Sequence, residues 1–154
     1  MVLEMYDARK EAKEYFDYYA NPDEDCKLKE YKDIIREEFY PANERKEAKL
    51  RFAVCRKAVS DYKKLKPSPD KIADLMLSYV ENACQFTNEY GDMGEQYYTS
   101  VENNFNRAMA FMNKNSLLEQ FKPRLTKCME LASPCGWGFA DAIACYYYDY
   151  FPYE

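Results

Sequence analysis

The chain contains no histidine among its 154 residues. That absence excludes nucleophiles activated by a histidine base, zinc sites with imidazole ligands, and the Glu-x-x-His motif of di-iron helical bundles. No spacing of the remaining reactive side chains indicates a catalytic centre. The sequence therefore predicts no catalytic residue, no metal ligand and no cofactor, and it favours a protein that is not an enzyme.

Glycine is also scarce, with 4 residues, and no segment alternates apolar and polar residues between turn signals as a β-strand does. Long apolar runs are missing, and residues 1–6 do not resemble a signal peptide. These absences predict an all-α, cytoplasmic protein without a membrane span. Because the length is enough for one substantial core, residues 1–154 are expected to form a single all-helical domain.

Cysteine is present six times, but never in the Cys-x-x-Cys spacing that indicates a metal or redox site. The chain is long for a disulfide scaffold and has no secretory signal, so no disulfides are expected. Reduced thiols that pack as small apolar groups are the expected state. Cys135, between a proline and a glycine, is the one cysteine that the sequence predicts to be exposed.

The clearest helix runs from Ser68 to Gly91. Ser68 is expected to cap its first turn, Pro69 to occupy its first position, and Gly91 to supply the left-handed residue that ends it. Between them, apolar residues recur at steps of three and four and cover more than half of the circumference. A helix with so broad an apolar surface packs on two sides, so this segment is expected to be the central helix.

Six further helices are predicted, with short connections between them. Ser116 and Glu119 are expected to form a capping box at the start of one helix, and Pro123 to kink or break it. Short connections favour antiparallel neighbours stacked as α-hairpins. The stack forms either a short irregular α-α superhelix, which is slightly favoured, or a compact bundle. The expected ranges are 3–19, 22–40, 43–65, 95–113, 116–133 and 139–150.

The helix expected at residues 43–65 is strongly basic. Residues 44–66 carry nine basic and three acidic side chains, a local charge of +6 in a chain of net charge −5. Basic residues on the face opposite its apolar stripe suit nucleic-acid phosphates. The alternative, favoured by the acidic net charge, is a solvated face or one paired with acidic neighbours such as residues 23–25. The candidate basic face is Arg45, Lys49, Arg56 and Lys63.

The C-terminal residues 146–153 are dense in tyrosine. Successive tyrosines on a helix cannot all face one core, and tyrosine suits interfaces because it buries area and keeps a polar hydroxyl. The alternative is that these tyrosines cover the end of the helix stack, and that the single tryptophan anchors a tight turn in the core. The candidate interaction surface is Tyr146, Tyr148, Tyr150, Tyr153 and Trp137.

Four segments spread over nearly the whole chain form a set: Tyr6–Tyr15, Asn21–Glu24, Pro67–Pro69 and Gly136–Phe139. Together they resemble an uncharacterised family of bacterial all-helical domains catalogued only as a domain of unknown function. The resemblance implies a bacterial cytoplasmic protein, and it implies no activity, cofactor or catalytic residue. Family members carry a short extra helical segment ahead of the Tyr6 region, so this chain is expected to be a shorter member or a trimmed one.

The absence of a catalytic constellation and the abundance of interface-type aromatics favour a non-catalytic protein-interaction or scaffold module. Its partner is expected to be another protein or a second copy of the chain. The alternative is a nucleic-acid-binding accessory protein that uses the basic face. Salt separates the two hypotheses, because phosphate contacts weaken steeply as salt rises whereas an apolar interface does not.

Overall fold

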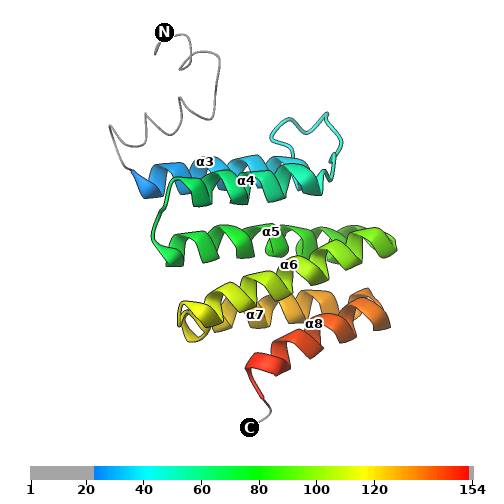
Figure 1. Cartoon of the computed structure of the whole chain (residues 1–154). Helices are drawn as coiled ribbons and strands as arrows, with labels where there is room; N and C mark the ends of the chain where they lie inside the picture. Colours follow the sequence, from blue (N-terminus) through cyan, green and yellow to red (C-terminus); the bar gives the residue numbers. More distant parts are fainter. Residues whose placement is uncertain (1–22, 153–154) are drawn as a thin grey trace.

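The computed structural model describes residues 23–152, and within that range it contains helices and no β-strand. The all-α class is therefore confirmed. Six of the seven predicted helices appear in the predicted order, and the helix predicted at residues 3–19 lies outside the described residues. The elements in Figure 1 are α3 (Glu24–Phe39), α4 (Phe52–Lys64), α5 (Pro69–Tyr90), α6 (Glu95–Lys114), α7 (Leu118–Ala132), a 3-10 turn (Ser133–Cys135) and α8 (Trp137–Tyr150).

The helix α5 occupies the centre, as predicted, because it packs against α3, α4, α6 and α7. Successive helices run antiparallel, and α8 packs on α6 and α7 at the far end from α3 and α4 (Figure 1). The buried side chains of the described helices form one core cluster. The arrangement is a compact bundle, so the slight preference for a superhelix is wrong. The reason is the broad apolar surface of α5, which neighbours cover on both sides.

The two ends of α5 lie where the sequence predicts them. Pro69 takes the first position, and Gly91 ends the helix with a φ of 91° while donating its N–H to the carbonyl of Thr87 at 2.9 Å. Ser68 is the N-cap residue, but its hydroxyl donates to Glu24 Oε2 at 2.7 Å and makes no cap. The serine therefore ties the start of α5 to the start of α3.

The basic helix α4 begins later than predicted, because residues 41–51 form a loop. Asn43 starts only a single turn, in which its side chain accepts from the N–H of Arg45 at 3.1 Å. Farther along, the buried carboxylate of Glu38 accepts two hydrogen bonds of 2.8 Å from the Arg51 guanidinium and one of 3.0 Å from the Arg51 N–H. This clamp holds the loop against α3 and lets α4 begin only after Arg51.

The junction between α6 and α7 also differs from the prediction. Ser116 has a φ of 58°, and Leu117 is the N-cap residue without a side-chain cap, so the capping box with Glu119 is wrong. Pro123 lies inside α7, which continues through it without a break. The proline ring is exposed on the surface, so it removes one backbone hydrogen bond without disturbing the buried side of the helix.

All six cysteines lie in the described range, and none of them forms a disulfide there. Cys135 is half-buried, and its thiol donates to the carbonyl of Leu131 at 3.4 Å. The prediction that Cys135 is the exposed cysteine is therefore wrong, since Cys26 and Cys145 are exposed instead. The buried thiols, which pack as small apolar groups, are Cys55, Cys84 and Cys128.

Candidate functional site

The helix α4 carries two rows of cationic side chains with different partners. In one row, Lys57 binds Asp61 at 2.7 Å, and Lys64 approaches the same carboxylate at 3.8 Å. In the other row, Arg56 and Lys63 line a groove that faces α6. Neither of these two forms an ion pair with a carboxylate in the part of the chain that the structure describes. One row of α4 is thus paired with a carboxylate, and the other has no such partner among the described residues.

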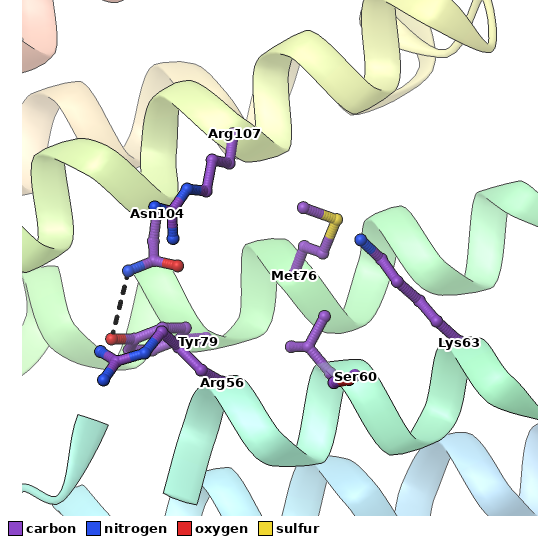
Figure 2. Close-up of a pocket in the computed structure, with 8 residues that line it drawn as sticks. Arg56, Ser60, Lys63, Met76, Tyr79, Asn104 and Arg107 are labelled. Carbon is purple, nitrogen blue, oxygen red and sulfur yellow. Dashed lines mark hydrogen bonds between the residues drawn. The ribbon is translucent and has the colours of Figure 1, made fainter. Parts of the chain in front are cut away.

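The groove lies between α4 and α6, which are not closely packed on each other, and α5 forms its floor. Its volume is about 210 Å³. Figure 2 shows the side chains of α4 rising towards those that descend from α6. The lining residues are Arg56, Val59, Ser60 and Lys63 from α4, Met76 and Tyr79 from α5, and Asn104 and Arg107 from α6.

Tyr79 lies at the floor of the groove and is 1% exposed. Its hydroxyl accepts a hydrogen bond of 3.4 Å from the Asn104 amide nitrogen, which also donates to the carbonyl of Ser100 at 2.7 Å. The carbonyl can only accept, so it fixes the orientation of the amide. Burial raises the pKa of Tyr79, and the charges of Arg56 and Arg107 oppose that shift without cancelling it. The phenol therefore keeps its proton at neutral pH.

The two ends of the groove differ in what surrounds their cations. Arg56 lies beside Tyr79, and Arg107 reaches from α6 towards the same end (Figure 2). At the other end, Lys63 lies over the ring of Phe111, with its Nζ 5.3 Å from the ring centroid. Arg107, like Arg56 and Lys63, has no carboxylate ion pair among the described residues. The groove is therefore a concave, positively charged surface with an aromatic and aliphatic floor.

The opposite side of α5 carries charge of both signs in direct contact. Arg124 from α7 binds Glu81 at 2.6 Å and Asp74 at 2.7 Å, and Lys32 from α3 binds Asp74 at 2.8 Å. Burial alone would lower the pKa of Arg124, but its hydrogen bonds to Glu81 and Asp74 outweigh burial and raise it. This network joins α3, α5 and α7, and its charges are satisfied within the fold.

The structure places two of the four residues of the predicted basic face on α4. Arg56 and Lys63 share a row on α4 and line the groove. Arg45 and Lys49 lie in the loop of residues 41–51, before α4 begins, so the continuous four-residue helical face is wrong. Lys49 lines a separate hollow of about 140 Å³ beside Glu38. The clamp between Glu38 and Arg51 holds residues 41–51 in a loop, so Arg45 and Lys49 do not continue the helical row of Arg56 and Lys63.

Arg107 is the groove residue that the sequence pattern did not reveal. It follows Asn104 by three positions on α6, so the two side chains share a face of that helix. This spacing is visible in the sequence, but it does not say that this side of α6 is turned towards α4. Tertiary packing across α5 brings Arg107 opposite Arg56.

The predicted tyrosine surface is only partly exposed. Tyr146, Tyr148 and Tyr150 are half-buried and pack against the core cluster. Tyr148 and Tyr150 also line a hollow of about 430 Å³ between α7 and α8. Tyr153 and the side chain of Trp137 lie outside the described residues, so the structure does not place them.

These features define the class of protein, an all-α bundle with a cationic groove beside its central helix. The chain belongs to DUF6155, a family of unknown function whose model matches residues 1–144. This family assignment agrees with the resemblance drawn from the sequence motifs. No curated protein and no solved structure matches the chain. The bacterial, cytoplasmic setting remains a prediction.

Neither a membrane span nor a metal site emerges within residues 23–152. Each described helix is too short or too polar to cross a bilayer. The same residues contain no cluster of three or more acidic or cysteine side chains arranged to hold a metal ion.

Proposed function

We propose that the protein is a non-catalytic protein-interaction module whose groove between α4 and α6 binds an acidic segment of a partner protein. The observation that carries this proposal is the charge of the groove: Arg56, Lys63 and Arg107 face it without a carboxylate partner among the described residues. Complementary charge steers a partner to the surface and fixes its register.

The size of the groove supports a partner segment over a cofactor. Pockets that enclose drug-sized ligands hold roughly 300 to 1,000 Å³. At about 210 Å³ the groove is smaller, and it is lined by both charged and apolar side chains. A volume of this size suits one or two side chains of an extended or helical segment. Met76 and Tyr79 then contact the apolar part of that segment, and the cations bind its acidic part.

The extent of the positive charge favours a protein over a nucleic acid. Arg56 and Lys63 are two turns apart on α4, which spans about 10 Å along the helix. Nucleic-acid affinity depends on many phosphate contacts, and this groove offers three cations in a chain of net charge −5. Nucleic-acid binding through Arg56 and Lys63 is therefore the competing outcome of the test.

The tyrosine-lined hollow between α7 and α8 is a second candidate for the same class of function, including self-association. Its Tyr148 and Tyr150 are already half-buried against the core, which leaves them less area for a partner. Lys122, the cation beside this hollow, has its Nζ 5.0 Å from the centroid of the Phe151 ring. The unpaired charge of the groove makes it the stronger candidate.

Fluorescence anisotropy tests the proposal. The probes are a labelled peptide with glutamates around a central leucine, its counterpart with glutamines, and single- and double-stranded DNA and RNA at low and moderate salt. The glutamate peptide is expected to bind at least about tenfold more tightly than the glutamine peptide. Equal affinity for the two peptides, or preferential nucleic-acid binding with a steep salt dependence, contradicts the proposal.

Two double variants serve as a matched pair in that titration. Arg56→Gln/Lys63→Gln removes the row that lines the groove, and it is expected to abolish the preference for glutamate. Lys57→Gln/Lys64→Gln removes the same charge from the row that is paired with Asp61, and it is expected to leave peptide affinity nearly unchanged. Equal losses in both variants would show that net charge, not the groove, governs binding.

A further inference from the structure

The end of the groove beside Tyr79 has more hydrogen-bond donors than the fold uses. Arg56 and Arg107 reach this end from opposite helices, and neither has a carboxylate partner among the described residues (Figure 2). The Tyr79 hydroxyl accepts from Asn104, and no described residue accepts a hydrogen bond from it in return. The Arg107 guanidinium, the N–H groups of Arg56 that do not bind the Tyr79 hydroxyl, and the buried hydroxyl proton are therefore available to an acceptor.

We propose that this end of the groove is a subsite for a phosphomonoester, carried by a phosphorylated side chain of the partner segment. This inference rests on the proposed function and names the chemistry that its acidic segment brings. The site is formed by Arg56, Arg107 and Tyr79, with Asn104 holding the phenol in place. Met76 and Lys63, farther along the groove, contact the residues that flank the phosphate.

Charge matching favours a phosphomonoester over a carboxylate. A phosphomonoester carries a charge of roughly −1.5 to −2 at neutral pH and has three acceptor oxygens. Two guanidinium groups neutralise that charge, and their planar N–H pairs bind phosphate oxygens through two parallel hydrogen bonds. A carboxylate has a single charge and two oxygens, so it would leave one of the two arginines unneutralised.

The buried phenol supplies the third donor. Tyr79 is 1% exposed, so its hydroxyl is almost removed from water, and its proton gains most from an acceptor that enters the groove. The Asn104 amide occupies the acceptor side of the same hydroxyl, because the Ser100 carbonyl turns its nitrogen towards Tyr79. The O–H donor is therefore left for a ligand, and a phosphate oxygen is an acceptor that fits this position.

Three labelled peptides of otherwise identical sequence test the subsite, with phosphoserine, glutamate or serine at the central position. The phosphoserine peptide is expected to bind about tenfold or more tightly than the glutamate peptide. Its advantage should grow as the pH rises through about 6, where the phosphate gains its second charge, while glutamate affinity stays level. Inorganic phosphate is expected to compete with the phosphoserine peptide, because both occupy the site formed by Arg56, Arg107 and Tyr79.

Variants distinguish binding at the phosphate subsite from nonspecific electrostatic attraction of the peptides to basic side chains. Tyr79→Phe removes the hydroxyl alone and is expected to reduce phosphoserine affinity severalfold without changing glutamate affinity. Arg107→Gln is expected to remove most of the preference for phosphoserine. Lys57→Gln/Lys64→Gln, in the row paired with Asp61, is the control and should preserve that preference. Circular dichroism and urea unfolding confirm that each variant is folded before it is titrated.

The outcomes distinguish failure of the subsite from failure of the proposed function. Equal affinity for the phosphoserine and glutamate peptides overturns the subsite and leaves the protein-docking function standing. If no peptide binds, the docking function is contradicted, and a titration with inorganic phosphate then tests the subsite on its own. Phosphate is expected to shift the side-chain NMR signals of Arg56 and Arg107. If these signals do not shift, the phosphate subsite is overturned. A preference for oligonucleotides over the phosphopeptide also contradicts the inference.

Discussion

The two sides of α5 differ in whether their charged side chains form ion pairs. On the side towards α3 and α7, Asp74 and Glu81 are bound by Lys32 and Arg124. On the side towards α4 and α6, Met76 and Tyr79 form the floor of a groove whose cations have no carboxylate partner among the described residues. The helix α5 thus separates a side whose charged residues form ion pairs from a side whose cations have no carboxylate partner among the described residues.

The difference indicates which side serves the fold and which is free for a partner. Ion pairs on the α3–α7 side cross between helices and bind carboxylates that are partly withdrawn from water, so the fold depends on them. Exposed cations on the α4–α6 side contribute little to stability. Their removal should leave the bundle intact while changing what it binds.

The largest expected effect is on stability, from Arg124→Met. This variant removes the cation that binds both Asp74 and Glu81, so that Asp74 keeps only Lys32 and Glu81 loses its ion pair. Because Arg124 is only partly buried, the expected loss is about 1–3 kcal/mol of unfolding free energy. Urea unfolding followed by circular dichroism at neutral pH measures it.

Arg107→Met is the matched control on the groove side. It makes the same chemical change at an exposed arginine without a carboxylate partner among the described residues. The expected change in unfolding free energy is within about 0.5 kcal/mol. Equal destabilisation by the two variants would show that the two sides of α5 do not differ as described.

A smaller effect is expected from Glu38→Gln, which breaks the clamp that sets the start of α4. Hydrogen bonds from Arg51 lower the pKa of Glu38 below its usual 4.5, against the opposing effect of burial. A lowered pKa means that the ionised carboxylate stabilises the folded state above about pH 4.5, and that this contribution is lost as the pH falls through the folded value.

Urea midpoints across that pH range measure the contribution of the clamp. Glu38→Gln is expected to unfold at lower urea than the parent at neutral pH, and the gap should close as the pH falls below 4.5 and through the lowered pKa of Glu38. The start of α4 is also held by the burial of Cys55, Ala58 and Tyr62, so peptide affinity should change little. A gap that is constant with pH contradicts an ionic clamp.

The sequence predicts most of the fold correctly because the apolar repeats of the helices are strong. The bounds of α5 follow from its Pro69 and Gly91 signals, which the structure confirms. The start of α4 is missed because residues 44–50 have good helix formers, whereas their actual conformation is decided by a pairing between Glu38 and Arg51, thirteen positions apart. Local propensity gives way to a tertiary contact at that point.

The groove could be predicted only in part, for a similar reason. Arg56 and Lys63 share a helical row that is visible in the sequence, but Arg107 joins them through the packing of α6 on α5. Nor does the sequence distinguish Lys57 and Lys64 from the groove pair until Asp61 is placed between them. A sequence gives the number of charged residues, but only the fold shows which of them form ion pairs and which remain available for binding a partner.

The smallest expected effect is on binding, from Tyr150→Ala in the tyrosine-lined hollow. Tyr150 lies on α8, and that helix packs on α6 and α7 and takes no part in the groove. The affinity for acidic or phosphorylated peptides should therefore change less than about twofold by anisotropy. A large loss would move the binding surface from the groove to the α7–α8 hollow.

The most direct test of the central claim is a charge swap across the groove. Arg56→Glu/Arg107→Glu is titrated with the glutamate peptide and with the same peptide carrying lysines in place of the glutamates. The parent is expected to bind the glutamate peptide, and the variant is expected to lose that binding and to bind the lysine peptide instead. If the variant still binds the glutamate peptide as tightly as the parent does, the groove between α4 and α6 is not the binding site.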